Sequence, residues 1–244
     1  MRGLNSAEVL WVWERGSRET PARRALTILA PVCTEATRQS LARLTLGERD
    51  ARLLELRERT FGPRLSSVVR CPACDQEVQA DFETKDVRVR HGAIKLSGEW
   101  RQGGIVARLR LPDGDDLEAA GRAADAGTAR RELIARCILE ARAVAGGVVA
   151  LAALPEEFIT AAAARISAAD PQANIELALR CPECAHAWSE LFDIADFFWT
   201  ELQAYAHRLL REVHELAAAH GWSEAEVLAL TPARRAAYLE LVRG

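Results

Sequence analysis

Cys71-Pro72-Ala73-Cys74 and Cys181-Pro182-Glu183-Cys184 are the two stretches that decide the fold of this 244-residue chain. Each is a Cys-Pro-x-Cys motif between strand-like residues, which is typical of one half of a two-knuckle zinc ribbon. Two cysteines three positions apart on a tight turn can face one ion, but tetrahedral Zn²⁺ needs four ligands. We therefore predict that four cysteines hold one structural Zn²⁺ per chain: Cys71, Cys74, Cys181 and Cys184.

The segment between the two motifs, residues 75–180, is far longer than in an ordinary zinc ribbon. It must therefore be an insertion whose two ends return to the same place. Strand-like residues flank each motif, at 65–69 and 77–82 and again at 175–179 and 187–192. Within the insertion we expect strands at 87–96 and 105–111, then helices beginning at Asp115 or Asp116, at Thr128 (running through Ile138) and at Pro155.

Helical patterns occupy both ends of the chain. Thr20-Pro21 combines a capping residue with proline at the first helical position, and Thr45-Leu46-Gly47-Glu48 has the spacing of a capping box. Another helix is expected to start at Thr34 or Glu35. The longest helix is predicted over 194–220, where apolar residues recur every three or four positions until Gly221.

These patterns predict an α+β fold that is mainly α. Helical N-terminal and C-terminal parts surround the four-cysteine zinc ribbon, and the ribbon carries a long β-plus-helical insertion. The expected division is an N-terminal helical region at 1–64, ribbon halves at 65–85 and 175–193, an insertion at 86–174 and a C-terminal long helix with a short helical tail at 194–244.

Four thiolates complete the coordination of zinc and leave no position for an activated water, so the metal is expected to be structural. A thiol oxidoreductase is a further interpretation, but a redox Cys-x-x-Cys pair opens a helix, whereas both motifs here run into strand-like residues. His186, two residues beyond Cys184, is an alternative ligand. Cys33 and Cys137 each stand alone in apolar helical surroundings, as buried cysteines do.

Composition and charge exclude several classes of protein. The chain is 49% hydrophobic and 27% charged, with 32 basic and 35 acidic residues, as in an ordinary globular protein. A zinc-ribbon regulator that binds nucleic acid is an alternative interpretation, but acidic residues outnumber basic ones around the knuckles. The basic residues there are Arg70, Lys85 and Arg180, and the acidic ones are Asp75, Glu77, Asp81, Glu83 and Glu183.

No catalytic or membrane motif stands out in the sequence. A glycine-rich phosphate loop, a nucleophile elbow and a zinc-protease helix are all missing, so we expect no enzyme activity and assign no catalytic or cofactor-binding residues. The longest uncharged run, residues 143–154, is too short to span a bilayer, and the first residues lack an apolar signal core. The expected location is the cytoplasm, with retention in an assembled particle left open.

Four groups of residues together resemble a known family. They are Phe61-Gly62-Pro63 before the first knuckle, Arg108-Leu109-Arg110-Leu111-Pro112, the second knuckle followed by Trp188 and Phe192-Asp193, and the tail Gly221-Trp222-Ser223-Glu224. The chain is similar in these residues to zinc-ribbon proteins of contractile phage tails and phage-tail-like injection systems, akin to the T-even-type base plate hub assembly chaperones. Ala185 stands where the family usually has glycine.

The resemblance implies a non-enzymatic assembly factor or structural subunit of a contractile tail base plate or hub. Its expected partners are base plate, hub or spike proteins. It leaves open whether the protein is a transient chaperone or a retained component, and it does not give the oligomeric state.

The apolar residues after Gly221 permit two interpretations. They include Trp222, Val227, Leu228 and Tyr238. They can fold back on the N-terminal helices around Trp11 and Trp13, or they can present a face to a partner, as helix-in-groove contacts do.

Overall fold

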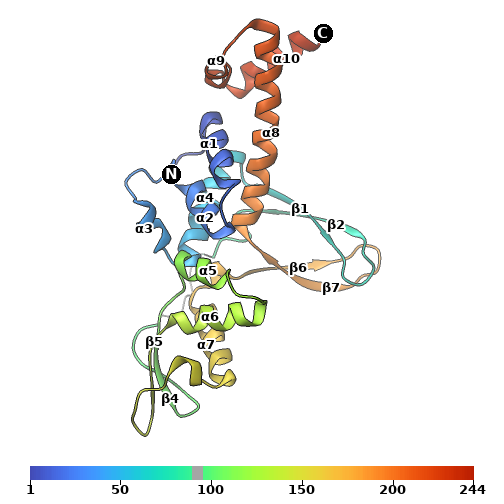
Figure 1. The fold of residues 1–244 in the computed structure, drawn as a ribbon. Coiled ribbons are helices and arrows are strands. Elements are labelled where there is room, and N and C mark those ends of the chain that lie inside the picture. The colour runs from blue at the N-terminus through green and yellow to red at the C-terminus, as the bar shows by residue number, and fades with distance from the viewer. Residues whose placement is uncertain (90–95) are drawn as a thin grey trace.

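The computed structural model describes residues 1–89 and 96–244, of which 53% is helix and 18% strand by share of the chain. This mixed, mainly helical architecture confirms the predicted fold class. The chain forms a central helical body, a two-ribbon arm (64–83 and 175–192), an insertion below the body and a helical knob (207–244) above it (Figure 1). Most of the strand predicted at 87–96 lies outside the described residues, and residues 87–89 are not in a strand.

The body consists of helices packed around one apolar core. They are α1 (Ser6–Gly16), α2 (Pro21–Leu29), α3 (Arg38–Ala42), α4 (Leu46–Phe61) and the first half of α8 (Ile194–His220). Fully buried aliphatic and aromatic side chains from α4 and α8, such as Leu53 and Phe198, belong to this core. The predicted capping box of α4 is present, because Thr45 and Glu48 exchange side-chain and backbone hydrogen bonds. The predicted start of α3 was wrong, since Thr37 caps it.

The insertion has its own sheet and its own core. Its elements are β3 (Trp100–Gln102), β4 (Ile105–Leu109), α5 (Gly114–Ala120), α6 (Ala126–Cys137), β5 (Ile138–Ala143), η1 (Leu151–Ala153), α7 (Glu156–Ala169) and η2 (Pro171–Ala173). The strands are antiparallel in the order β3-β4-β5. Three sequence-based expectations were wrong here. Asp113, not Asp115 or Asp116, caps α5. Asp125, not Thr128, caps α6, and that helix ends at Cys137 so that Ile138 opens a strand.

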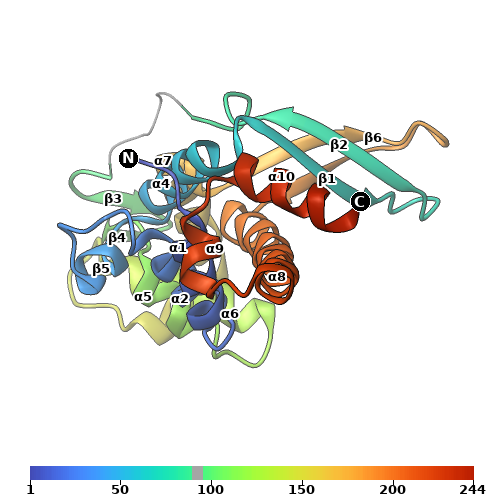
Figure 2. The ribbon, with the colours of Figure 1, turned by 90° about the horizontal axis from the view of Figure 1, so that it is seen from above.

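The arm consists of two hairpins that project side by side from the body (Figures 1 and 2). One hairpin joins β1 (Arg64–Arg70) to β2 (Glu77–Glu83), and the other joins β6 (Ile175–Arg180) to β7 (Ala187–Phe192). Each hairpin is a separate two-stranded antiparallel ribbon. At the base of the arm, the ring of Phe82 contacts that of Phe192 edge-on, with 5.3 Å between centroids.

The knob lies at the far end of α8, which at ~1.5 Å per residue is about 40 Å long. Gly221 ends α8 with φ of +70°, the left-handed conformation that glycine adopts most readily. Helices α9 (Glu224–Ala229) and α10 (Pro232–Arg243) then fold back onto α8 and share a small core with it, including Leu216, Val227 and Leu239. The residues after Gly221 therefore pack against the last turns of α8 rather than against the N-terminal helices.

No helix among residues 1–89 and 96–244 combines the length and the apolar character needed to cross a membrane.

Candidate metal centre

The two Cys-Pro-x-Cys motifs form nearly identical turns at the tips of the two ribbons. In the first, the N–H of Cys71 donates to the carbonyl of Gln76 at 2.9 Å, and the N–H of Asp75 donates to the carbonyl of Cys71 at 2.9 Å. In the second turn, Cys181 and Ala185 donate to the carbonyls of His186 and Cys181, at 2.9 and 3.0 Å. These hydrogen bonds fold each turn tightly enough to point both of its cysteines toward the opposite ribbon.

The residue that follows each second cysteine has a left-handed backbone. Asp75 and Ala185 both have φ of +59°, and they are the only residues other than glycine with positive φ in the described part of the chain. Aspartate tolerates this conformation better than alanine does. The strain at Ala185 explains why glycine suits that position, and it marks the second knuckle as the less relaxed of the two.

The structure brings together four sulfur atoms from segments more than one hundred residues apart. All four lie within 4.8 Å of one another, and the Sγ atoms of Cys71 and Cys184 and of Cys74 and Cys181 are each 3.6 Å apart. A tetrahedral ion with Zn–S bonds of ~2.3 Å requires sulfur atoms about 3.8 Å apart. The cysteine cluster therefore has the donor set and the spacing of a structural zinc site.

Two of the four cysteines are buried and two are exposed. Cys71 and Cys181 are buried, whereas Cys74 and Cys184 are exposed at the tip of the arm. Val78 is buried beside the two inner cysteines, and Val69 and Trp188 partly cover them. A metal bound here would replace the apolar core that two narrow ribbons are too small to form.

The electrostatics of the cluster favour the thiolate of Cys181 and oppose that of Cys74. The backbone N–H groups of Cys184 and Glu183 stabilise the Cys181 thiolate and lower the pKa of that thiol to about 7. The backbone of Gln76 favours the Cys74 thiolate as well, but hydrogen bonding with the neighbouring thiols outweighs it and raises the pKa of Cys74 to about 12. Because a dication stabilises all four thiolates together, metal binding would release the remaining protons.

His186 lies outside the cysteine cluster. Its ring is exposed and stacks on Trp188 with 6.1 Å between centroids, and the group of possible metal ligands found among the described residues contains only the four cysteines. Both knuckles are followed by strands, β2 and β7, as the sequence predicted. The surroundings thus differ from the strand-to-helix turn in which a redox Cys-x-x-Cys pair works. Of the other cysteines, Cys137 is buried and Cys33 is half-buried.

Hydrogen bonds at the two ends of the insertion hold the ribbons in place. The side chain of Gln172 accepts from the N–H of Val89 at 2.8 Å and donates to the carbonyl of Val87 at 3.3 Å, so the residues entering and leaving the insertion are joined. Nearby, a carboxylate oxygen of Asp170 accepts from the N–H of Gly47 at 2.8 Å, at the start of α4. A Cβ at Gly47 would lie 1.7 Å from that carboxylate, so a larger residue here would displace the Asp170 side chain from this hydrogen bond. The sequence predicted that the two ends of the insertion meet, but it did not identify the residues that join them.

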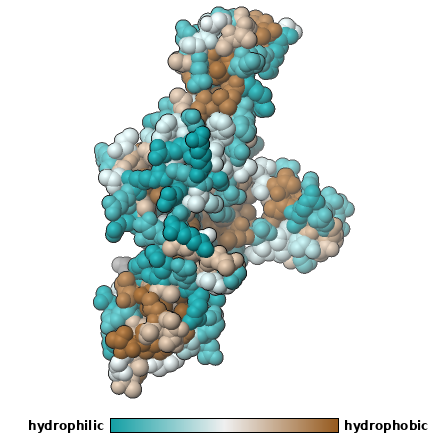
Figure 3. Space-filling model, viewed as in Figure 1, coloured by the Kyte–Doolittle hydropathy of each residue, from teal (hydrophilic) through white to brown (hydrophobic). Residues whose placement is uncertain are grey.

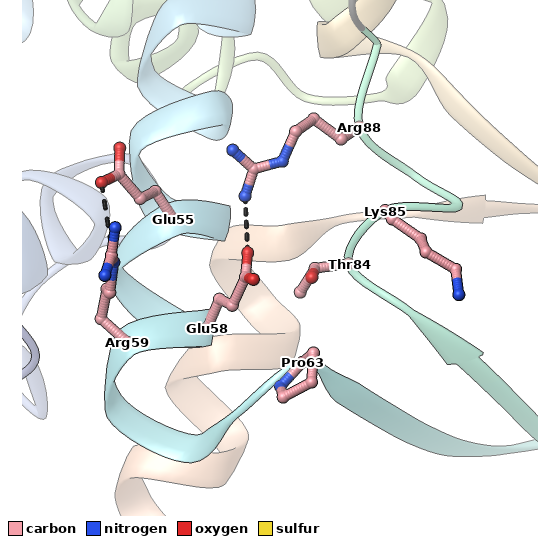
Figure 4. Close-up of a pocket in the computed structure, with 7 residues that line it drawn as sticks. All are labelled: Glu55, Glu58, Arg59, Pro63, Thr84, Lys85 and Arg88. Atoms are coloured by element: carbon pink, nitrogen blue, oxygen red, sulfur yellow. Dashed lines mark hydrogen bonds and ion pairs between the residues drawn. The ribbon is translucent and has the colours of Figure 1, made fainter.

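A polar cleft of about 750 Å³ lies at the base of the arm, between α4 and residues 84–88 (Figure 4). Arg88 reaches across it to Glu58 at 2.7 Å, and Arg59 lies 4.0 Å from Glu55. Lys85 is paired with Glu83 at 2.7 Å. The charged side chains lining this cleft are thus held in ion pairs.

Comparison with known proteins gave one match. A family model described as "T4 bacteriophage base plate protein" matches residues 17–199, three quarters of the chain. The match includes α2 to α7, both ribbons and all four clustered cysteines, and it ends near the start of α8. No curated protein and no solved structure matched the chain.

Proposed function

The chain belongs to the T4 bacteriophage base plate protein family, and from this membership we propose that it is a non-enzymatic assembly factor or structural subunit of a contractile tail base plate or hub. The observation that carries the proposal is the match over residues 17–199, which includes α2 to α4 of the body, the arm and the insertion together. Its partners are then other base plate, hub or spike proteins, and it meets them during assembly in the bacterial cytoplasm.

The proposed role of Cys71, Cys74, Cys181 and Cys184 is to hold one structural Zn²⁺. Support comes from the spacing of the four sulfur atoms and from the closed shell that four thiolates make around zinc. Such a shell leaves no coordination position for substrate. When bound, the ion would join the tips of two ribbons that share no backbone hydrogen bonds, and so make the arm one rigid element.

The exposed charges of the arm argue against a nucleic-acid-binding regulator. The arm carries three arginines and seven acidic residues, and a phosphate backbone would be repelled by such a surface. They are Arg64, Arg70 and Arg180, against Asp75, Glu77, Asp81, Glu83, Glu176, Glu183 and Glu190. A thiol oxidoreductase is disfavoured because neither cysteine pair opens a helix.

Co-expression tests the proposed function directly. The tagged chain is expressed together with the base plate, hub and spike proteins encoded beside its gene, and complexes are purified and identified by mass spectrometry. We expect a defined complex with at least one of these proteins, and analysis of finished particles then separates a retained subunit from a transient chaperone. Failure to associate with any of them, or salt-dependent binding to DNA or RNA instead, would overturn the proposal.

A further inference from the structure

An open groove runs along the knob, between an exposed face of α8 and the end of α10. It measures about 750 Å³, and six of its seven lining residues come from α8 at positions 210, 211, 214, 215, 218 and 219; Val242 of α10 completes it. On a helix these positions form one continuous face. Figure 3 shows apolar residues on the knob at the top of the molecule.

The floor of the groove is apolar and shallow enough to admit a helix backbone. Leu210 is partly exposed, Ala218 and Ala219 offer only methyl groups, and Val242 is half-buried. Leu241, the residue before Val242, is 77% exposed. From Leu210 to Ala219 the groove extends about 14 Å along α8, which is the length of two to three helical turns. A partner helix with an apolar stripe of that length fits this surface.

The charges at the rim of the groove select the kind of helix. Glu215 is held by Arg243 through two hydrogen bonds of 2.9 Å, so its carboxylate is neutralised. Arg211 is exposed and makes no ion pair with another described residue, and His214 beside it is exposed as well. The rim therefore offers an unpaired cation, whose complement on a partner is a carboxylate.

We propose that this groove docks an amphipathic helix of a partner protein, with aliphatic residues on its buried face and acidic residues along the edge that meets Arg211. The inference rests on the proposed function, because it names the surface through which an assembly partner is held. The family match ends at residue 199, before the groove begins, so the knob lies outside the part of the chain that identifies the family. A docking surface there would set which partner this particular protein takes.

A synthetic peptide provides the probe. It is an amphipathic helix of about four turns with leucines on one face and glutamates flanking them, and a matched peptide has arginines in place of the glutamates. Binding of each to the full-length protein is measured by fluorescence anisotropy. We expect the acidic peptide to bind and the basic one to bind at least tenfold more weakly.

Variants distinguish docking in the groove from non-specific binding of the peptide. Ala218→Trp fills the groove and should abolish binding of the acidic peptide. Arg211→Glu should weaken it about tenfold and improve binding of the basic peptide. Arg234→Glu is the matched control, because Arg234 is an exposed arginine of α10 outside the groove, and it should leave binding unchanged. Circular dichroism checks that each variant keeps its helices.

Several outcomes would overturn the proposal. Three concern the peptides: the acidic peptide does not bind, both peptides bind equally well, or Ala218→Trp binds the acidic peptide as well as the parent protein does. The fourth is a dimer in light scattering that Ala218→Trp dissociates, because a second copy of the chain would then occupy the groove. Co-purification distinguishes this failure from failure of the proposed function. If base plate proteins co-purify equally well with the parent protein and with both groove variants, the function stands and the groove is not its docking surface.

Discussion

Ala185 is the residue whose replacement probes the second knuckle without removing a ligand. It follows Cys184 directly, has φ of +59°, and donates its N–H to the carbonyl of Cys181 at 3.0 Å. Glycine at this position keeps the same backbone hydrogen bond and removes the clash between Cβ and the carbonyl that a left-handed backbone creates. Ala185→Gly should therefore stabilise the folded knuckle and, with it, the bound metal.

The size of the effect follows from two opposing contributions. A non-glycine residue in the left-handed region costs about 1–2 kcal/mol. Glycine loses more backbone entropy on folding, which returns about 0.5–1 kcal/mol of that gain. The net stabilisation is about 0.5–1 kcal/mol. Because a zinc knuckle folds as it binds, this difference should appear as a two- to fivefold tighter dissociation constant for zinc.

Competition with a coloured zinc chelator measures that constant. Ala187→Gly is the matched control, because Ala187 is also exposed and begins β7, but its backbone is not left-handed. The control should bind zinc no more tightly than the parent chain. At Asp75 the gain from glycine should be smaller, since aspartate tolerates this backbone and Arg70 contacts its carboxylate at 3.3 Å. Unchanged or weaker zinc binding by Ala185→Gly would refute the assignment of strain to the metal-bound turn.

Three further predictions concern the metal, the closure of the insertion and acid stability. Cys71→Ser should lose the bound zinc, as measured by atomic absorption. In the parent protein, four additional thiols should react with a thiol reagent only after a chelator is added. Fast reaction of two thiols without chelator would indicate a redox pair. Gln172→Ala should lower the free energy of unfolding by about 1–3 kcal/mol and speed hydrogen exchange at the Val89 amide, and unaltered exchange would contradict the proposed closure. Burial alone would raise the pKa of Asp116, but hydrogen bonds led by those from Arg110 lower it to about 2. Its stabilising effect is therefore full above pH ~4 and is lost as the pH falls through ~2. Asp116→Asn should cost on the order of 2 kcal/mol in denaturant titrations at pH 7 and much less near pH ~2. An equal loss at both pH values would refute this origin.

Local chemistry in the sequence was enough to predict the elements that depend only on near neighbours. The helix predicted at 194–220 has those bounds, since its apolar stripe and the glycine at 221 are both local signals. The capping box beginning at Thr45 is present for the same reason. The convergence of the two knuckles was predicted from the demand of one ion for four ligands, and the separated segments do meet.

Elements that depend on distant partners were missed. The helix before β5 was expected to run through Ile138, and no strand was predicted at Ile138–Ala143, because a short aliphatic run after a helical pattern is compatible with either structure. Pairing with β4, in which Leu109 lies opposite Ile138, decides in favour of the strand. Similarly, the Gln172 side chain forms hydrogen bonds with backbone groups more than eighty residues away. No pattern in the sequence around Gln172 predicts that contact.

The cysteine cluster and the groove lie in parts of the molecule joined to opposite ends of α8, which indicates that they serve separate roles. The arm enters α8 through Asp193, which caps the helix directly after β7, and the knob closes its far end around Leu216. The arm and the knob have separate stabilising contacts. The buried cysteines of the cluster pack with Val78 at the tip of the arm. The knob has its own apolar core and an ion pair between buried Arg235 and half-buried Glu212. Losing the metal should therefore loosen the ribbons while the groove keeps its shape. On the proposed function, a partner held in the groove would then remain bound while the arm engages or releases the rest of the base plate.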